Sequence, residues 1–304
     1  MTKRLRWKVG MLEGRATVAL IILSNLPTFQ RLVAQSVESL AVRFSGMTAV
    51  TGYEQAMTDS LLALLPGSTR DRAGNVTLSL GRGAPKRLVT CPLDEVGYAV
   101  GNVMDDGYLT LRRVGGGPRL AYPIFDQQIE GHRVTLFGRR GAVPGVVGVR
   151  STHLARGRPA ATEPPFTVDN AYVDVGAAAR AEVDALGLGV LTPVALTKRP
   201  HRYGDHGGLL AAPAAGRRAA CAALAAAVRA QPRVRGTVVV AFTVQSLYAV
   251  NAGLNTVKNL QGPFDDTREL TIPVKFPDTA VETVALSDVE ALVRDVVQWI
   301  GGGR

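Results

Sequence analysis

The chain has 304 residues and a formal net charge of +10, with 35 Lys and Arg residues against 25 Asp and Glu residues. An apolar fraction of 46% and a charged fraction of 20% exclude a disordered chain, and no apolar run is long enough to predict a membrane-spanning helix. The positive charge favours acidic partners, such as anionic lipid or an acidic protein surface, although a general arginine bias is the simpler explanation. Nucleic acid is not an expected partner, because few aromatic residues alternate with the basic ones.

Residues 1–27 are predicted to form an N-terminal arm that is first basic and then apolar. The arm only partly resembles a signal peptide, because charges fall late in it and no clear cleavage site follows. We expect it to contact a partner subunit or an anionic membrane surface, and the alternative is a frayed extension without a function. The residues predicted to make this contact are Arg4, Arg6, Trp7 and Lys8.

The next part of the chain predicts two helices followed by two strands. Apolar residues at helical spacing indicate a helix within 28–46, and a second helix follows TGYE, with Thr51 or Gly52 near its N-cap. The runs GNVTLSL and RLVTCPL predict strands separated by a turn. From residue 98 to residue 208, short alternating runs separated by glycine indicate a small all-β domain.

Helical texture returns after this β domain. A helix is predicted over 216–230, followed by the strands TVVVAFTVQ and ELTIPVKF. A last helix is predicted with Ser287 as its N-cap and Gly301 just beyond its end. The fold class is therefore α/β, with a core formed by residues 28–97 and 209–304 that is interrupted by the β domain 98–208.

Two acidic residues and two cysteines suggest where chemistry could occur. Asp94 and Glu95 follow a buried strand in TCPLDEVGYAV, and strand ends are where open α/β sheets usually bind ligands and metals. Burying a charge at this position costs free energy unless the charged group binds a ligand, a metal or another polar group. Cys91 and Cys221 lie far apart and lack zinc-ligand spacing, so we expect two buried, reduced thiols and a reducing compartment.

Eight stretches in order resemble the M42 family of metallo-aminopeptidases. They are TGYE, AGNV, LDEVGYAV, VPGVVGVRSTHL, VDVGAAARAEVDALGLGV, GRRAACAAL, FTVQSLYAV and IPVKFPDTAVETV. The resemblance implies an M42-like α/β core with an inserted β-barrel-like domain, shortened in its C-terminal part. It also implies a site in which paired metal ions activate a water and a glutamate acts as the general base.

Transferred position by position, the metal ligands of the family are replaced in this chain. The family's ligand and base positions fall on Pro92, Gly216, Ser246, Leu247 and Asp278. The resemblance gives Asp94 the role of a carboxylate that once oriented the lost histidine. Of the five residues at the ligand and base positions, Asp278 alone has a side chain that could still bind a metal, and only weakly by itself.

These substitutions lead to the prediction of a degenerate family member that is not an enzyme and holds no metal or cofactor. The expected function is that of a structural subunit in a larger bacterial assembly, cytoplasmic or peripheral to the inner membrane, and a homo-oligomer stays open. One alternative is an active, metal-dependent aminopeptidase of the M42 family. The other is a peptide-binding module without catalysis.

Overall fold

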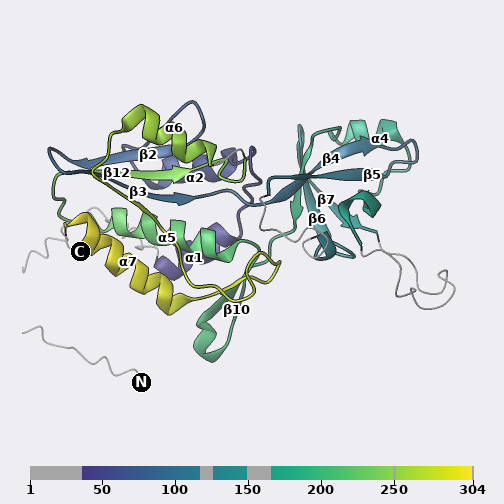
Figure 1. Ribbon diagram of the computed structural model, residues 1–304. Helices are drawn as coiled ribbons and strands as arrows, with labels where there is room; N and C mark the ends of the chain where they lie inside the picture. The colour runs from purple at the N-terminus through teal and green to yellow at the C-terminus, as the bar shows by residue number, and fades with distance from the viewer. Residues whose placement is uncertain (1–35, 117–125, 149–165, 249–250, 303–304) are drawn as a thin grey trace, which may run out of the picture. The chain divides into compact units, whose positions relative to one another are not determined.

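The computed structural model describes residues 36–116, 126–148, 166–248 and 251–302 (Figure 1). The N-terminal arm and its predicted contact residues Arg4, Arg6, Trp7 and Lys8 lie outside the described residues. Within the described part, no helix is both long enough and apolar enough to cross a membrane.

The described chain begins with two helices and three strands. They are α1 (Val37–Ser45), α2 (Gln55–Leu64), β1 (Thr69–Arg70), β2 (Val76–Gly81) and β3 (Lys86–Pro92). The Ser36 side chain caps α1 by accepting the Ser39 N–H at 3.1 Å. Helix α2 begins later than predicted, with Glu54 at its N-cap position instead of Thr51 or Gly52. The reason is local, because Gly52 has a φ of +84°, which ends the preceding turn outside a helical conformation.

A five-stranded sheet organises the core, in the order β1-β2-β12-β3-β13. Strand β12 (Thr237–Thr243) pairs antiparallel with β2 and parallel with β3, and β13 (Asp266–Glu269) pairs parallel with β3. Helix α6 (Ala252–Gln261) connects β12 to β13. The strand predicted at ELTIPVKF is therefore displaced towards the N-terminus and includes only the first residue of that run.

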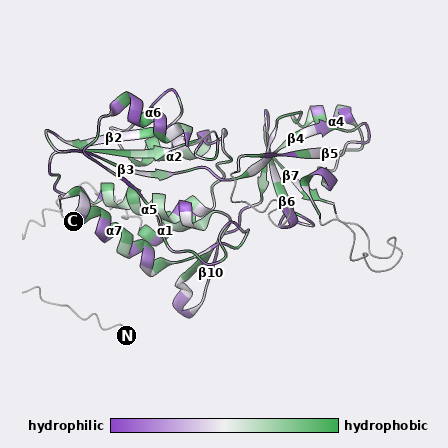
Figure 2. Ribbon diagram, viewed as in Figure 1, coloured by the Kyte–Doolittle hydropathy of each residue, from purple (hydrophilic) through white to green (hydrophobic). Residues whose placement is uncertain are grey.

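Side chains of β12 alternate between the two faces of this sheet, as a strand requires. Val238, Val240 and Phe242 pack into the large core with helices α1, α5 (Ala215–Arg229) and α7 (Leu286–Ile300). Val239 and Ala241 face the other side, where they meet apolar residues of α6. Figure 1 shows α6 on one side of the sheet and α1, α5 and α7 on the other, and Figure 2 shows hydrophobic colouring along the central strands.

The inserted β region closes into a barrel, as predicted. Its strands run in the order β4-β5-β8-β7-β6-β9. They are β4 (Gly97–Val103), β5 (Leu109–Val114), β6 (Arg133–Gly138), β7 (Gly141–Val147), β8 (Tyr172–Asp174) and β9 (Pro193–Leu196). The short helices η1 (Val168–Asn170) and α4 (Arg180–Ala185) accompany them. Buried residues such as Leu109, Leu136 and Val194 fill a core separate from that of the α/β sheet.

Three further strands form a small antiparallel sheet outside the barrel. Strand β11 (Leu209–Ala211) pairs with both β10 (His201–Tyr203) and β14 (Thr283–Ala285), and η2 (Asp205–Gly207) joins β10 to β11. Helix α7 follows β14 directly and starts earlier than the predicted cap Ser287, with Ala285 at its N-cap position. The N–H of buried Leu286 is bonded to the Gly208 carbonyl, so tertiary contacts and not a capping side chain fix this helix start.

The two cysteines are joined by a disulfide, which corrects the prediction of two reduced thiols. Cys91 in β3 and Cys221 in α5 have Cα atoms 5.5 Å apart, within the range for a disulfide. Both residues are fully buried, as predicted. The bond ties the central sheet to helix α5, and the argument from free cysteines to a reducing compartment no longer holds.

Candidate functional site

The parallel pairing of β3 with β12 brings two chain segments together at one edge of the central sheet. Pro92 and Thr243 are register partners, and both strands end there. The Leu93 N–H donates to the Thr243 carbonyl at 2.7 Å, so the chains stay together beyond the strands. The residues that follow, including Asp94 and 244–247, therefore meet at this edge, where the sequence predicted a site.

Asp94 is fully buried at this edge and belongs to what we call the Asp94 cluster, formed by Asp94, Arg217, Ser246 and Leu247. The Ser246 hydroxyl donates to Asp94 Oδ1 at 2.6 Å, and the Leu247 N–H donates to Oδ2 at 2.9 Å. Arg217 Nη1 donates to Ser246 Oγ at 2.7 Å and lies 3.7 Å from Asp94 Oδ1. Two donors and a nearby cation compensate the buried carboxylate, as a charge in this environment requires.

The segment 244–247 is held by side chains from other parts of the chain as well. Because it has left the sheet, its N–H groups need new acceptors. The Val244 N–H donates to Asn75 Oδ1 at 3.0 Å, and the Gln245 N–H donates to Glu54 Oε1 at 2.8 Å. Asn75 comes from the AGNV stretch and Glu54 from TGYE, so two of the recognised motifs position the segment that follows β12.

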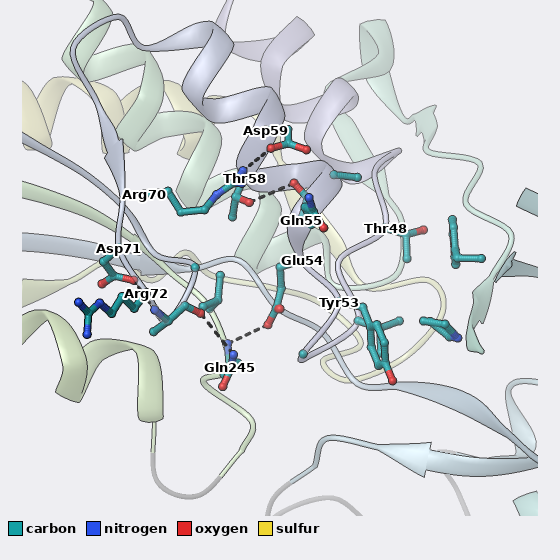
Figure 3. Close-up of a pocket in the computed structure, with 18 of the residues that line it drawn as sticks. Thr48, Tyr53, Glu54, Gln55, Thr58, Asp59, Arg70, Asp71, Arg72 and Gln245 are labelled. Atoms are coloured by element: carbon teal, nitrogen blue, oxygen red, sulfur yellow. Dashed lines mark hydrogen bonds and ion pairs between the residues drawn. The ribbon is translucent and has the colours of Figure 1, made fainter. Parts of the chain in front are cut away.

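Glu54 also lines a cavity of about 740 Å³, which we call the Glu54 cavity (Figure 3). Its walls come from the start of α2, the turn between β1 and β2, the segment after β12, and the β6–β7 turn of the barrel. Burial raises the pKa of Glu54, the N–H groups of Gln245 and Gly52 oppose this effect, and the nearby Asp94 charge adds to it. The cavity thus contains a buried carboxyl that binds its proton more readily than an ordinary glutamate.

Polar side chains on both sides of Glu54 also line the cavity. In Figure 3, Asp71 and Arg72 lie on one side of Glu54 and Tyr53 lies on the other. Asp71 is occupied within its own turn, because its carboxylate accepts the N–H of Ala73 at 2.9 Å and two donors of Asn75. On this side of the cavity, the Asp71 carboxylate is therefore held in place within its turn, and the basic residue Arg72 lies next to it in the chain.

A second buried cluster, the Glu95 cluster, consists of Glu95, Lys198 and Arg218. Lys198 donates to Glu95 Oε2, Arg218 Nη2 lies 3.3 Å from Oε1, and the Ala49 N–H donates to Oε1 at 3.1 Å. Burial lowers the pKa of Lys198 to about 8, and Glu95 opposes this shift. Burial alone would raise the pKa of Glu95, but the two cations outweigh it, so this pKa lies below its usual range. Glu95 precedes β4 and Lys198 follows β9, so the cluster joins the two connections between core and barrel.

A third buried carboxyl belongs to Glu282, which directly precedes β14 in the chain and contacts the start of α5. It accepts the Gly216 N–H at 2.6 Å and the Asp278 N–H at 3.1 Å. Burial raises the pKa of Glu282, and these two N–H groups oppose the shift. A Cβ atom at residue 216 would lie 2.6 Å from Val274 Cγ1 and 2.9 Å from Glu282 Oε1, so a larger residue requires these side chains or the helix start to shift.

The described residues do not fit the paired metal centre that the family resemblance implies. Among the positions transferred from the family, Pro92, Gly216 and Leu247 have no side-chain donor, and the Ser246 hydroxyl is bonded to Asp94. Within the described ranges, no group of three or more His, Cys, Asp or Glu residues could hold a metal ion. We therefore assign no catalytic step to a metal on these residues.

The structure brings some of the predicted site residues together and separates others. Asp94, Ser246 and Leu247 form one cluster, whereas Gly216 and Asp278 both donate to Glu282. Pro92 takes part in the backbone pairing at the end of β3. The sequence analysis assigned no role to the residues that complete these clusters, namely Glu54, Lys198, Arg217, Arg218 and Glu282.

Residues 74–246 match the family model described as M42 glutamyl aminopeptidase. The SgcX protein of Escherichia coli, whose aminopeptidase name is itself an inference, is 33% identical over 159 residues. The lysyl aminopeptidase of Pyrococcus furiosus is 29% identical over 150 residues. These matches cover 50% and 47% of this chain and 40% of each relative, so the chain spans less than half of these relatives in sequence.

A solved structure of similar fold covers far more of the chain. The TET1 peptidase of Pyrococcus horikoshii superposes with a TM-score of 0.75 at 20% sequence identity. This superposition covers 87% of the present chain and 99% of the other. The similarity confirms the predicted α/β peptidase fold with its inserted barrel.

The comparisons correct the prediction that the protein is not an enzyme. The matched family is described as an aminopeptidase family, and the P. furiosus relative is named a lysyl aminopeptidase, which points to an enzyme. The replaced ligand positions do not show that activity is lost, because a site is defined by the side chains that surround it and not by correspondence of positions alone.

Proposed function

The chain belongs to the M42 glutamyl aminopeptidase family, and from this premise we propose that the protein is an aminopeptidase that removes residues from the N-terminus of peptides. The observation that carries the proposal is the family match over residues 74–246. This range contains strands β2, β3 and β12, helix α5 and all six strands of the barrel, with Asp94, Arg217 and Ser246 of the Asp94 cluster. Glu54 and most residues that line the Glu54 cavity precede it.

The Glu54 cavity is the proposed peptide site. Its volume of about 740 Å³ lies within the range of roughly 300–1,000 Å³ that is usual for small-ligand sites. It borders the segment after β12, which also supplies Ser246 and Leu247 of the Asp94 cluster. A peptide in this cavity would therefore lie close to the Asp94 cluster.

Glu54 is the residue to which we assign proton transfer. Hydrolysis adds the oxygen of a water to the carbonyl carbon, breaks the C–N bond, and moves a proton from the water to the leaving amine. A carboxyl that accepts the first proton and donates it to the amine meets both needs, and a raised pKa favours the donating form. Asp94 is the less suitable candidate, because it is fully buried and is not among the residues that line the cavity.

The test is an assay of the purified protein on peptides with a free N-terminus, on the same peptides after N-acetylation, and on aminoacyl-anilides. Each substrate is tested without added metal and with zinc, cobalt or manganese. We expect release of the N-terminal amino acid from the free peptides only, and a loss of kcat of about 100-fold or more in Glu54→Gln. The control variant is Arg82→Gln, an exposed arginine in the turn after β2 that does not line the cavity. No turnover on any free peptide under any of these conditions would refute the proposal.

We also infer that the protein assembles with copies of itself. The support is the P. horikoshii TET1 peptidase, which is described as able to assemble into a tetrahedron or a large octahedral shell. Sedimentation of the purified protein tests this, and a monomer at all concentrations would contradict it.

The N-terminal arm keeps its predicted role as a contact with a partner or with an anionic membrane surface. The support is the order of basic and then apolar residues within 1–27. Fractionation of cells that express the chain with and without these residues tests the idea. A distribution that does not depend on the arm would count against it.

A further inference from the structure

The Asp94 cluster contains a serine hydroxyl that the proposed reaction at Glu54 does not use. Ser246 Oγ donates to Asp94 Oδ1 at 2.6 Å and accepts from Arg217 Nη1 at 2.7 Å. A serine hydroxyl has one proton and two lone pairs, so these two contacts leave one lone pair of the oxygen unused. The oxygen can therefore attack a ligand while its proton is directed at a carboxylate.

The Asp94 carboxylate is placed as the base of a nucleophile requires. The distance of 2.6 Å between Ser246 Oγ and Asp94 Oδ1 is short enough for direct proton transfer. Asp94 is fully buried, and the Leu247 N–H donates to its other oxygen at 2.9 Å, which holds the carboxylate towards Ser246. The cluster therefore combines a nucleophile, a base and a group that orients the base.

Arg217 provides a positive charge at the position where negative charge would develop. Its guanidinium donates to Ser246 Oγ and lies 3.7 Å from Asp94 Oδ1. A cation held beside a hydroxyl favours loss of the proton, and it also stabilises an oxyanion formed on a bound acyl group. Ser246 is half-buried and the Arg217 side chain is 35% exposed, whereas Asp94 has no exposed surface. A ligand can therefore reach the hydroxyl and the guanidinium, while the base is shielded from water.

Ser60 in α2 has the same arginine contact without the carboxylate. Its Oγ accepts from Arg43 Nη2 at 2.7 Å, the distance that also separates Arg217 from Ser246. Within the described residues, no carboxylate accepts the Ser60 hydroxyl. Of these two serines, Ser246 alone is bonded to a base, and Ser60 is its natural comparison.

We propose that Ser246 is a nucleophile that accepts acyl groups from esters, with Asp94 as its base and Arg217 as the cation that stabilises the negative charge. Ser246 Oγ forms a bond to the carbonyl carbon, and its proton passes to Asp94 Oδ1. The bond to the leaving alcohol then breaks, and Asp94 gives the proton to the leaving oxygen. A water molecule next attacks the acyl group and passes a proton through Asp94 to Ser246 Oγ, so the products are an acid and an alcohol.

This activity does not depend on the proposed hydrolysis of peptides at Glu54, which uses no covalent intermediate. Esters are the expected class of substrate, because an alcohol or phenol leaves with less protonation than an amine needs. The group that limits the reaction is the carboxylate base, which is weaker than a histidine. We therefore expect reaction with activated esters, such as those of phenols, to be fastest.

The test treats the full chain with diisopropyl fluorophosphate, which phosphorylates activated serines, and with p-nitrophenyl acetate. Mass spectrometry of the intact protein detects the adducts, and peptide mapping locates them. With the fluorophosphate we expect a single adduct on Ser246 and none on Ser60 over the same period. With the ester we expect a burst of p-nitrophenol that matches acetylation of Ser246.

Variants assign the roles within the cluster. Ser246→Ala should abolish the adduct, and Asp94→Asn should slow its formation by about 100-fold, because an amide does not take up the proton. Arg217→Gln should also slow it, whereas Arg217→Lys retains the charge and should retain part of the rate. Ser60→Ala is the matched control and should react like the wild type. The comparison of Ser246 with Ser60 in the wild type needs no variant, so the test holds even if a variant misfolds.

The outcomes separate this inference from the proposed function. Absence of any adduct on Ser246 overturns the inference, and so does labelling of Ser246 that is no faster than that of Ser60. Equal rates in the wild type and in Asp94→Asn show that the hydrogen bond to Asp94 is only structural, and they overturn it as well. Cleavage of peptides without labelling of Ser246 leaves the proposed function in place and removes the nucleophile. Labelling of Ser246 without cleavage of any peptide has the opposite meaning.

Discussion

Replacing Glu95 with glutamine should destabilise the protein by about 3–5 kcal/mol, the usual effect of breaking a buried ion pair. The Glu95, Lys198 and Arg218 side chains are only 6%, 3% and 0% exposed. Glutamine keeps an oxygen that can accept the Ala49 N–H, so the change removes the negative charge with little effect on shape. It leaves two buried cations without a counter-charge, and water cannot reach them to compensate.

Thermal unfolding followed by circular dichroism would measure this effect. For a chain of this size, about 3–5 kcal/mol corresponds to a decrease in Tm of roughly 6–20 °C. The matched control is Asp295→Asn, which breaks the pair with Arg268 on the surface, where the two side chains are 51% and 31% exposed. We expect this control to cost less than about 1 kcal/mol, because solvent screens exposed pairs.

The pH dependence provides a second check on the same cluster. The pKa of Lys198 is about 8 in the folded protein and about 10.4 in an unfolded chain. Between these values the unfolded chain binds the additional proton, so the contribution of Lys198 to the free energy of unfolding rises with pH from 8 to 10. Lys198→Met should remove this rise. A Glu95→Gln variant as stable as the surface control, or a wild type and Lys198→Met with the same pH profile, would refute the reasoning.

Three other predictions address the remaining buried groups. Glu54→Gln should gain stability relative to the wild type as pH rises from 4 to 8. Burial raises the folded pKa of Glu54, so the contribution of this carboxyl to the free energy of unfolding of the wild type falls as pH rises through that pKa. Urea denaturation at several pH values measures this difference, and parallel profiles for the two proteins would contradict it. Gly216→Ala should cost about 1–3 kcal/mol, because the new Cβ would lie 2.6 Å from a side-chain carbon, and an unchanged Tm would show that the start of α5 can shift. After maleimide treatment of the denatured protein without reductant, mass spectrometry should find no modified thiol. The double change of Cys91 and Cys221 to alanine should lower the free energy of unfolding by about 2–5 kcal/mol. Two reactive thiols in the denatured, unreduced protein would contradict the disulfide.

The sequence was informative where a local pattern determines the structure. Runs rich in apolar and β-branched residues predicted β3 and β12 close to their observed bounds, because strands covered on both faces have few polar positions. Helix α5 was predicted within one residue, since alanine and leucine favour helices strongly. Helix α6 was missed, because only Gly253, Leu254 and Val257 are buried among its residues and the periodic signal is weak.

The interactions that the sequence analysis missed connect residues that are distant along the chain. Cys91 and Cys221 are separated by 130 residues, and no spacing rule links such a pair. Glu95 and Lys198 lie on the two connections to the barrel, so their contact depends on closure of the barrel between them. Asp94 was recognised as unusual from its position after a strand, but its donors Ser246 and Leu247 could only be identified once the pairing of β3 with β12 was known.

The position of β12 between β2 and β3 has a consequence for the order in which the molecule is made. A nascent chain on the ribosome completes β2 and β3 more than a hundred residues before β12 (Thr237–Thr243), whereas every strand of the barrel lies between residues 97 and 196. The barrel can therefore fold during synthesis while the central sheet still lacks its middle strand. Until β12 arrives, β2 and β3 each present an unpaired apolar edge, and such edges pair readily with other chains. The period between synthesis of the barrel and of residue 243 is thus when this protein is most exposed to aggregation.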